Sequence, residues 1–291
     1  MQVSEYDLDQ RQGRRVPSPG CCIYCRTSSA GLTDEHVVPY ALGAHTLVLE
    51  ESCCPACQEI IQPYEQEVLR RQLGVFRAQV DAPTRNKKDR PSSVRMHFVE
   101  VGDDGTVLRD LGYRPVPLEE VPLSLNLWSS PPPRLLMKVP SRDVGRAWTY
   151  FDQKAVASLC QKVRAETGAN HVAVKTGDVN RKSYLRSLAK MAHAYASAEL
   201  GLDSFEPLLE EIILDRSDDI EKFVGDAPAE SPMHEDPAHT VRIAIGETVG
   251  EEAGGYLVAT IQLYPMLKSP VHMVVFGRPL IDIGARFSPP A

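Results

Sequence analysis

The sequence of 291 residues is 43% hydrophobic, which is enough to bury a sizeable core and suggests about two domains. It contains no apolar run near the ~20 residues that a membrane-spanning helix needs, and no signal-peptide core follows Met1. We therefore expect a cytoplasmic protein without a membrane partner, in which the seven cysteines are reduced rather than joined as disulfides.

The net charge of −7 hides an uneven distribution along the chain. Residues 70–95 carry eight basic and two acidic side chains, a balance of +6, whereas residues 195–291 carry six basic and seventeen acidic ones, a balance of −11. Because affinity for phosphate depends on local charge, the basic stretch is compatible with a nucleic-acid partner.

Residues 1–19 are expected to form a flexible arm, because they lack apolar periodicity. Arg14 and Arg15 lie in this arm, and we interpret them as part of a solvated tail. The arm leads into a segment with a very different composition, in which cysteines and apolar residues are concentrated.

Four cysteines form two Cys-x-x-Cys pairs separated by 28 residues: Cys22, Cys25, Cys54 and Cys57. Two such pairs match a tetrahedral zinc site with metal–sulfur distances of about 2.3 Å. This kind of site is structural, because four thiolates leave no coordination position for a substrate. Cys21 and Cys53 adjoin the ligands and offer alternative registers, whereas Cys160 is expected to be a small buried apolar residue.

The segment between the two pairs contains Glu35-His36-Val37-Val38-Pro39 and then Gly43. Together with the cysteine pairs, this pattern resembles the HNH endonuclease family, in the branch whose finger is stapled by two zinc knuckles. The resemblance covers residues 20–90. It implies a treble-clef-like ββα-metal finger, in which a β-hairpin and a helix hold a catalytic divalent ion, Mg²⁺ or Mn²⁺, next to the structural zinc.

In that family the histidine on the first strand is the general base that activates water. The acidic residue before it, and an Asn or His just after the last cysteine, bind the ion. Position by position, the resemblance implies that His36 is the base, that Glu35 is a catalytic residue and metal ligand, and that Gln58 is the second ligand. Gln58 departs from the family pattern, although its amide oxygen can coordinate Mg²⁺. The family's middle Asn is also missing from residues 47–51.

These departures leave two other interpretations open. One is a zinc-stapled nucleic-acid-binding or assembly module that has lost cleavage, which the missing Asn ligands favour and the retained Glu35-His36 pair opposes. The other is a zinc ribbon of a regulatory protein, which leaves the basic stretch unexplained.

The finger itself is predicted to contain strands at residues 33–40 and 46–49 and then a helix. After Cys57, apolar residues follow helical spacing at positions 60, 61, 64, 68 and 69. Pro63 is expected to kink this helix and Gly74 to end it. Glu65 lies two turns beyond Gln58, and we expect it to be too far away to share an ion with it.

The basic side chains after the finger are suited to phosphate contacts rather than base readout, because few of them are rigid. We expect them to bind DNA: Arg70, Arg71, Arg85, Lys87, Lys88 and Arg90. Arg71 can also pair with Glu67, four residues earlier on the same helix.

From residue 93 the pattern changes to a larger mixed α+β domain of unknown role, residues 93–291. Strands are predicted at 93–101, 106–109, 135–139, 171–175, 240–245, 255–263 and 271–276. Helices are predicted at 152–166, 180–200, 205–214 and, more briefly, 218–221. The whole chain is therefore expected to be α+β, with an arm (1–19), an HNH-like zinc finger nuclease domain with its basic linker (20–92) and this larger domain. The resemblance implies that it hydrolyses phosphodiester bonds in DNA.

Overall fold

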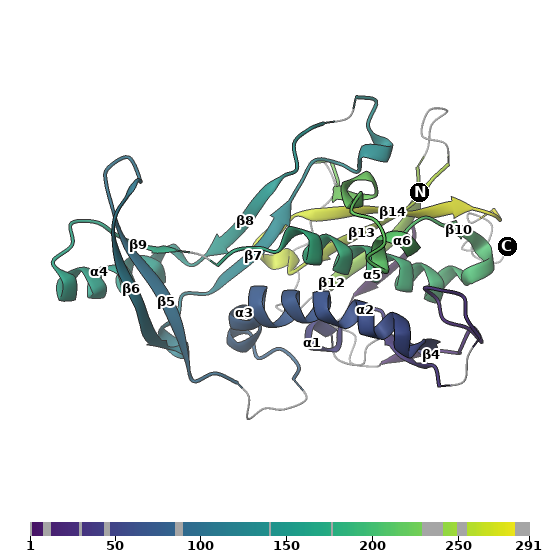
Figure 1. The fold of residues 1–291 in the computed structure, drawn as a ribbon, viewed down its shortest axis with the longest axis horizontal. Coiled ribbons are helices and arrows are strands. Elements are labelled where there is room, and N and C mark those ends of the chain that lie inside the picture. The colour runs from purple at the N-terminus through teal and green to yellow at the C-terminus, as the bar shows by residue number, and fades with distance from the viewer. Residues whose placement is uncertain are drawn as a thin grey trace.

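The computed structural model describes residues 2–7, 13–28, 31–43, 47–84, 90–139, 141–175, 177–228, 241–248 and 255–282, and it is a mixed α/β structure (Figure 1). The helices are α1 (Tyr40–Gly43), α2 (Pro55–Gln66), α3 (Gly74–Gln79), α4 (Gln153–Thr167), α5 (Arg181–Leu200) and α6 (Glu210–Ile213). The strands are β1 (Gln2–Asp7), β2 (Arg14–Val16), β3 (Thr33–His36), β4 (Leu47–Cys53), β5 (Ser93–Val101), β6 (Val107–Pro117), β7 (Ser124–Ser129), β8 (Arg146–Phe151), β9 (Val172–Lys175), β10 (Phe205–Pro207), β11 (Val224–Asp226), β12 (Val241–Glu247), β13 (Leu257–Leu263) and β14 (Val271–Pro279).

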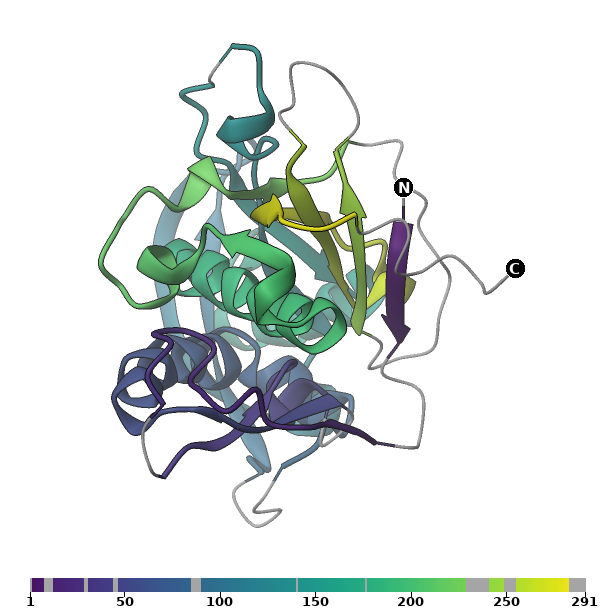
Figure 2. The same cartoon turned by 90° about the vertical axis from the view of Figure 1, so that its right-hand side faces the viewer.

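The largest sheet has six antiparallel strands in the order β1-β12-β13-β14-β10, with β11 also paired to β14. In β12 the side chains of Val241, Ile243 and Ile245 are buried and their neighbours are not, which is the alternation expected of a strand with one face on the core. This face packs against α5, which lies between the sheet and the finger (Figure 2).

Helix α5 is the central element of the fold. Its start is capped by Asn180, whose side chain accepts a hydrogen bond from the Ser183 N–H, and Gly201 follows its last turn. In this helix 17 of the 20 residues are buried, because the finger covers one side and the sheet covers another. Lys190 and His193 are therefore inside the protein.

The cysteine-containing finger consists of the three-stranded sheet β2-β4-β3 and a long helical segment. Pro55 occupies the first turn of α2, where a backbone N–H has no intrahelical partner in any case. Pro63 lies inside α2, which continues as a π-helical stretch at Glu67–Gln72 and then as α3. Gly74 begins α3 rather than ending the helix as predicted, because Leu73 keeps a right-handed helical conformation.

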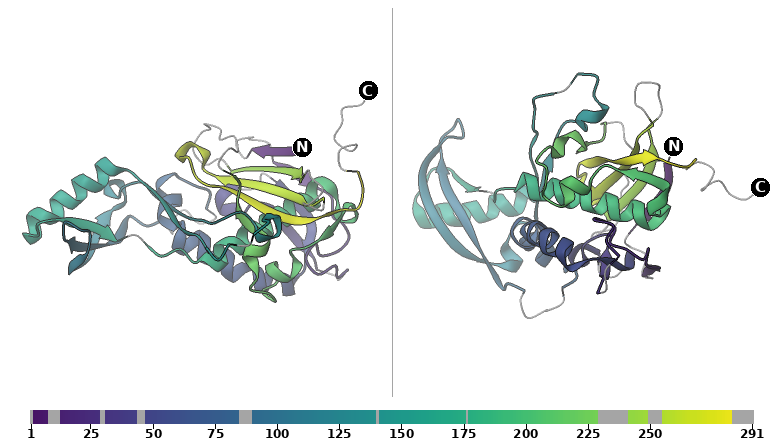
Figure 3. Two further views of the ribbon diagram at one scale, coloured as in Figure 1. Left: turned by 90° about the horizontal axis from the view of Figure 1, so that it is seen from above. Right: turned by 45° about the vertical axis from the view of Figure 1, so that its right-hand side comes forward.

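A lobe formed by β5, β6, β9 and α4 projects from one side of the molecule (Figures 1 and 3). It has its own small core of Phe98, Val116, Val121, Leu159 and Val163. The predicted helix in this lobe is confirmed, since the Asp152 side chain accepts from the N–H groups of Lys154 and Ala155 at the start of α4. The hairpin β7-β8 joins the lobe to the rest of the protein.

One hydrophobic core extends from the finger through α5 to the large sheet. Phe76 of α3, for example, makes an edge-to-face contact with Tyr264, which follows β13, with ring centroids 4.6 Å apart. Residues on both sides of position 92 therefore contribute to this core.

Other sequence-based expectations also differ from the structure. The described parts of residues 1–19 are not a flexible arm: β1 pairs with β12 and β2 pairs with β4, because backbone groups at a sheet edge can pair with a strand of any side-chain pattern. Residues 135–139 are not a strand, and Arg134–Leu136 form a 3₁₀ turn directly after three prolines. Residues 205–214 divide into β10 and α6, because Pro207 has no N–H for a helix interior.

The other predicted strands of the larger part correspond to β5, β6, β9, β12, β13 and β14. The short helix expected at 218–221 is a 3₁₀ turn at Ile220–Lys222. No helix in the described ranges combines the length and the apolarity needed to cross a membrane.

Candidate functional site

The four cysteines of the two predicted pairs form one cluster. Their sulfur atoms all lie within 4.8 Å of one another, and the sulfurs of Cys25 and Cys54 are 3.6 Å apart. This spacing agrees with the edge of a tetrahedron, about 3.8 Å, around an ion 2.3 Å from each sulfur. Cys21 and Cys53 are not part of the cluster, and the described cysteines form no disulfides, as we expected.

Backbone hydrogen bonds fix the positions of both Cys-x-x-Cys pairs. The first lies in a turn in which the Arg26 N–H donates to the Cys22 carbonyl, and the Ile23 N–H donates to Ser52, next to the second pair. A hydrogen bond from Cys53 lowers the pKa of Cys22 to about 3, whereas burial raises the pKa of Cys57. A bound cation would favour ionisation of all four thiols.

Helix α5 supports the cluster through His193. The Nε2–H of this fully buried histidine donates to the carbonyl of Ile23, 2.7 Å away, and its ring lies 5.6 Å from the Tyr24 ring. Burial lowers the pKa of His193 to about 4, so the imidazole is neutral.

The three residues that the resemblance singled out, Glu35, His36 and Gln58, line a single cavity of about 850 Å³ beside the cysteine cluster. Glu35 and His36 end β3, which pairs with β4, and Gln58 lies in the first turn of α2. The strand register shifts between Thr33 and Glu35, an irregularity that can redirect side chains next to a site. His36 is half-buried and Gln58 is exposed.

A lysine from α5 occupies the inner wall of this cavity and forms what we call the Lys190 cluster (Lys190, Glu35 and Glu65). The Lys190 Nζ forms ion pairs with Glu35 and with Glu65, the latter at 3.0 Å, and donates to the backbone carbonyl of His36 at 2.7 Å. Lys190 is 2% exposed. Glu65, which we had expected to lie too far from Gln58 to share its ion, therefore reaches the same ammonium as Glu35.

The protonation states in the Lys190 cluster follow from burial and charge. Burial raises the pKa of Glu35, and the negative charge of Glu65 adds to this effect, while Lys190 opposes it. Burial alone would lower the pKa of Lys190, but the two carboxylates outweigh it and raise that pKa. The lysine is thus charged, and one ammonium is shared by two acids.

This arrangement does not fit a divalent ion bound through Glu35 and Gln58, because the Glu35 carboxylate is already paired with Lys190. Within the part of the chain that the structure describes, the four cysteines form the only cluster of at least three His, Cys, Asp or Glu ligand atoms. Nothing in the sequence near the finger signals Lys190, since it comes from a distant helix.

The predicted DNA-binding residues have different environments. Arg70 is exposed and lines the cavity. Arg71 pairs with Glu67 at 3.3 Å, as predicted. Arg90 forms an ion pair with Asp81 and donates to the carbonyl of Ala82. Arg85, Lys87 and Lys88 lie outside the described residues.

Arg77, which the sequence did not single out, also lines the cavity. Its guanidinium donates to the carbonyls of Ala41, Leu69 and Pro83, so it holds α1, the helical segment and the following loop together.

No protein-family model, curated protein or solved structure matches this chain. The description of the site therefore rests on the structure alone. The protein is a mixed α/β structure with a four-cysteine cluster that can bind a metal, and a polar cavity lies next to this cluster.

Proposed function

We propose that this protein is an HNH-type endonuclease that hydrolyses phosphodiester bonds in DNA, with His36 as the general base. The observation that supports this most strongly is that Glu35, His36 and Gln58, chosen from the sequence alone, line one cavity next to the four cysteines. We further propose that the cysteines bind a structural zinc ion, because four sulfur ligands close its coordination sphere.

In this proposal the His36 imidazole removes a proton from the water that attacks phosphorus. The side chain is half-buried, so it can be oriented by the protein and still be reached from the cavity. The bond from Lys190 to the His36 carbonyl fixes the backbone of the base. Arg70, exposed in the same cavity, is suited to hold the phosphate.

The resemblance also implies Mg²⁺ or Mn²⁺ on Glu35 and Gln58. Because Lys190 already pairs with Glu35, we assign no step of the reaction to such an ion. Whether cleavage depends on added Mg²⁺ or Mn²⁺ is to be measured separately.

The same ion pair supports a second candidate function, a zinc-stapled module that binds DNA without cutting it. An acid that is buried against a lysine can stabilise the finger without taking part in chemistry. The two candidates differ in what His36 does: the nuclease requires its imidazole, and the binding module does not.

A cleavage assay on plasmid and on single-stranded DNA, with and without added Mg²⁺ or Mn²⁺, separates the candidates. For a nuclease, His36→Ala loses on the order of 10² to 10⁴-fold in rate, the usual contribution of a general base, and keeps its metal content, melting temperature and DNA affinity. His171→Ala is the matched control, since the His171 side chain is 61% exposed and does not line this cavity.

Gln58→Asn is an informative third variant, because it restores the residue that the family has at this position. A higher rate indicates a native site that works with a suboptimal ligand. If the wild type and both variants bind DNA and none cuts it under any of these conditions, the nuclease proposal is wrong and the binding module replaces it.

A further inference from the structure

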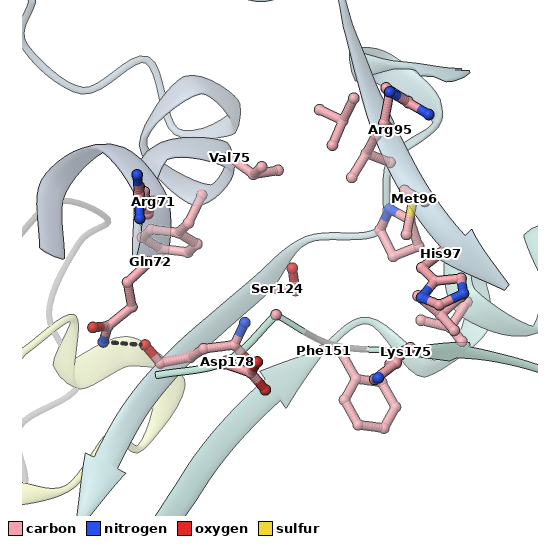
Figure 4. A pocket seen from close by; sticks show the side chains of 18 of the residues that line it. Arg71, Gln72, Val75, Arg95, Met96, His97, Ser124, Phe151, Lys175 and Asp178 are labelled. Carbon is pink, nitrogen blue, oxygen red and sulfur yellow. Dashed lines mark hydrogen bonds between the residues drawn. The ribbon is translucent and has the colours of Figure 1, made fainter. Parts of the chain in front are cut away.

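A second cavity, of about 420 Å³, lies between the finger helix and the projecting lobe (Figure 4). Gln72 and Val75 line its helical side, and Met96 and His97 of β5 line the opposite side. The helical side is anchored to the β7-β8 hairpin, because the Gln72 Nε2 donates to the carbonyl of Asn126 at 2.9 Å. The cavity thus lies between elements that are held together.

The interior of this cavity is mostly apolar. Val121, Val156 and Val174 line it, and so does Phe151, which is 42% exposed at the end of β8. An apolar pocket with a few polar groups is the usual form of a site for an organic ligand. A flat aromatic group that stacks on Phe151 would satisfy this lining.

The charged groups around the cavity are mainly cationic. Arg71, Arg95 and Lys175 line it, against a single carboxylate, Asp178. Arg95 is held in place, since its guanidinium lies 5.4 Å from the centre of the Tyr113 ring. A ligand that combines an aromatic ring with negative charge therefore matches both parts of the lining.

The second cavity is a neighbour of the first, because Val75 and Val94 line both. A polymer whose phosphate lies near Arg70 in the first cavity can therefore extend past these valines into the second. A single nucleotide repeat offers what the lining requires, an aromatic base and a phosphate.

We propose that the second cavity binds an unpaired nucleobase of the DNA strand that occupies the first cavity, with the base stacked on Phe151 and the neighbouring phosphates near Arg71, Arg95 and Lys175. The inference rests on the proposed function for the position of the strand. A base inside a duplex is stacked on both faces and paired at its edge, so it cannot enter a concave site without being extruded. The preferred substrate is therefore single-stranded DNA or a junction with an unpaired end.

The test measures binding rather than cleavage, so that it does not depend on catalysis. In the full-length, metal-loaded His36→Ala protein, Phe151→Ala is compared with its parent for binding to a fluorescent oligo(dT) strand and to a blunt duplex of equal length. We expect the affinity for oligo(dT) to fall roughly 10- to 100-fold, the effect of losing one base–aromatic stack, and the affinity for the duplex to stay unchanged.

Two control variants accompany this comparison. Phe151→Tyr keeps an aromatic ring and is expected to bind oligo(dT) like the parent. Leu108→Ala removes another exposed apolar side chain, 66% exposed, that does not line the cavity, and it is expected to have no effect.

The proposal is overturned if the parent does not bind oligo(dT), or if Phe151→Ala binds it as tightly as the parent. A parallel loss of duplex binding would also overturn it, since the site would then not select unpaired bases. Failure of the nuclease proposal has a different signature, because a chain that binds oligo(dT) through Phe151 and never cuts plasmid retains the base site and lacks only the activity.

Discussion

Lys190, in the middle of α5, forms a buried ion pair with Glu35, the residue that the HNH resemblance assigns to a catalytic metal ion. The ammonium also contacts Glu65, so a single positive charge lies between two carboxylates at the place where a divalent cation was expected. The pair explains how the finger is attached to α5, and it makes Glu35 a positioning residue for β3.

The first prediction concerns this ammonium. Lys190→Met leaves the buried Glu35 and the half-buried Glu65 without their ammonium and should destabilise the protein by about 3–5 kcal/mol, the usual effect of breaking a buried pair. The position between Glu35 and Glu65 should then accept a divalent cation, which prefers carboxylate oxygens. Thermal melting should show that added Mn²⁺ stabilises Lys190→Met and leaves the wild type unchanged.

The double variant Lys190→Met, Glu65→Gln is the control, since it lacks one of the two carboxylates and should respond less to Mn²⁺. If Mn²⁺ stabilises the wild type as strongly as Lys190→Met, and Glu35→Gln abolishes that response, the ion binds through Glu35 despite the lysine. The assignment of Lys190 as the cation of the site would then be wrong.

The second prediction concerns the cysteine cluster. We expect one zinc ion per chain, and Cys57→Ser should lose it together with most of the cooperative unfolding transition, because a structural zinc ion contributes on the order of 10 kcal/mol to folding. Elemental analysis and thermal melting measure the two effects. Cys160→Ser is the matched control, since Cys160 is a half-buried cysteine outside the cluster. Purified protein without zinc, or a stable Cys57→Ser variant, would contradict the prediction.

The parts of the site that the sequence predicts are those with local signals. The cysteine spacing predicts the cluster because each pair belongs to one turn. Helices α4 and α5 are also predicted, and the structure shows that each begins at a local cap, Asp152 or Asn180, that acts within three residues. In each case the interacting groups are close together in the chain.

The parts that the sequence does not predict depend on distant packing. Lys190 and His193 resemble ordinary polar positions of an amphipathic helix, and they contact the finger only because two layers enclose α5. The pairing of β1 with β12 likewise involves backbone groups from the two ends of the chain. The second cavity forms between separate elements and has no sequence motif.

The third prediction concerns the basic side chains. Replacing Arg70, Arg85, Lys87 and Lys88 together by Gln should weaken binding to duplex DNA and flatten its dependence on salt, by about 0.9 in the logarithmic slope for each phosphate that the variant no longer neutralises. Arg90 is left intact, because it forms an ion pair with Asp81 and donates a hydrogen bond to the Ala82 carbonyl.

The matched control for this variant replaces four other cations that line neither cavity: Lys138, Arg142, Lys154 and Arg164. It changes the net charge by the same amount and should leave the salt dependence largely as it is. Equal slopes for the two variants would mean that the predicted stretch acts only through the overall charge of the protein.

The last prediction concerns pH and His193. Its Nε2–H donates to Ile23, its Nδ1 is buried without a hydrogen-bond partner in the described structure, and burial lowers its pKa to about 4. In the unfolded chain the imidazole has a pKa of about 6.5, so between these values the unfolded state binds a proton that the folded state does not. Stability should therefore be fully present above pH about 6.5 and fall as the pH is lowered toward 4, by about 2 kcal/mol at pH 5 from this group alone.

Denaturant unfolding of the wild type and of His193→Gln at pH 7 and pH 5, both with saturating zinc, measures this contribution. The Gln variant can still donate to the Ile23 carbonyl but does not titrate, so its stability should decrease less between the two pH values. Loss of zinc from protonated thiolates affects both proteins alike and cancels in the comparison. An equal decrease in the two proteins would show that the buried imidazole is not what makes the finger sensitive to acid.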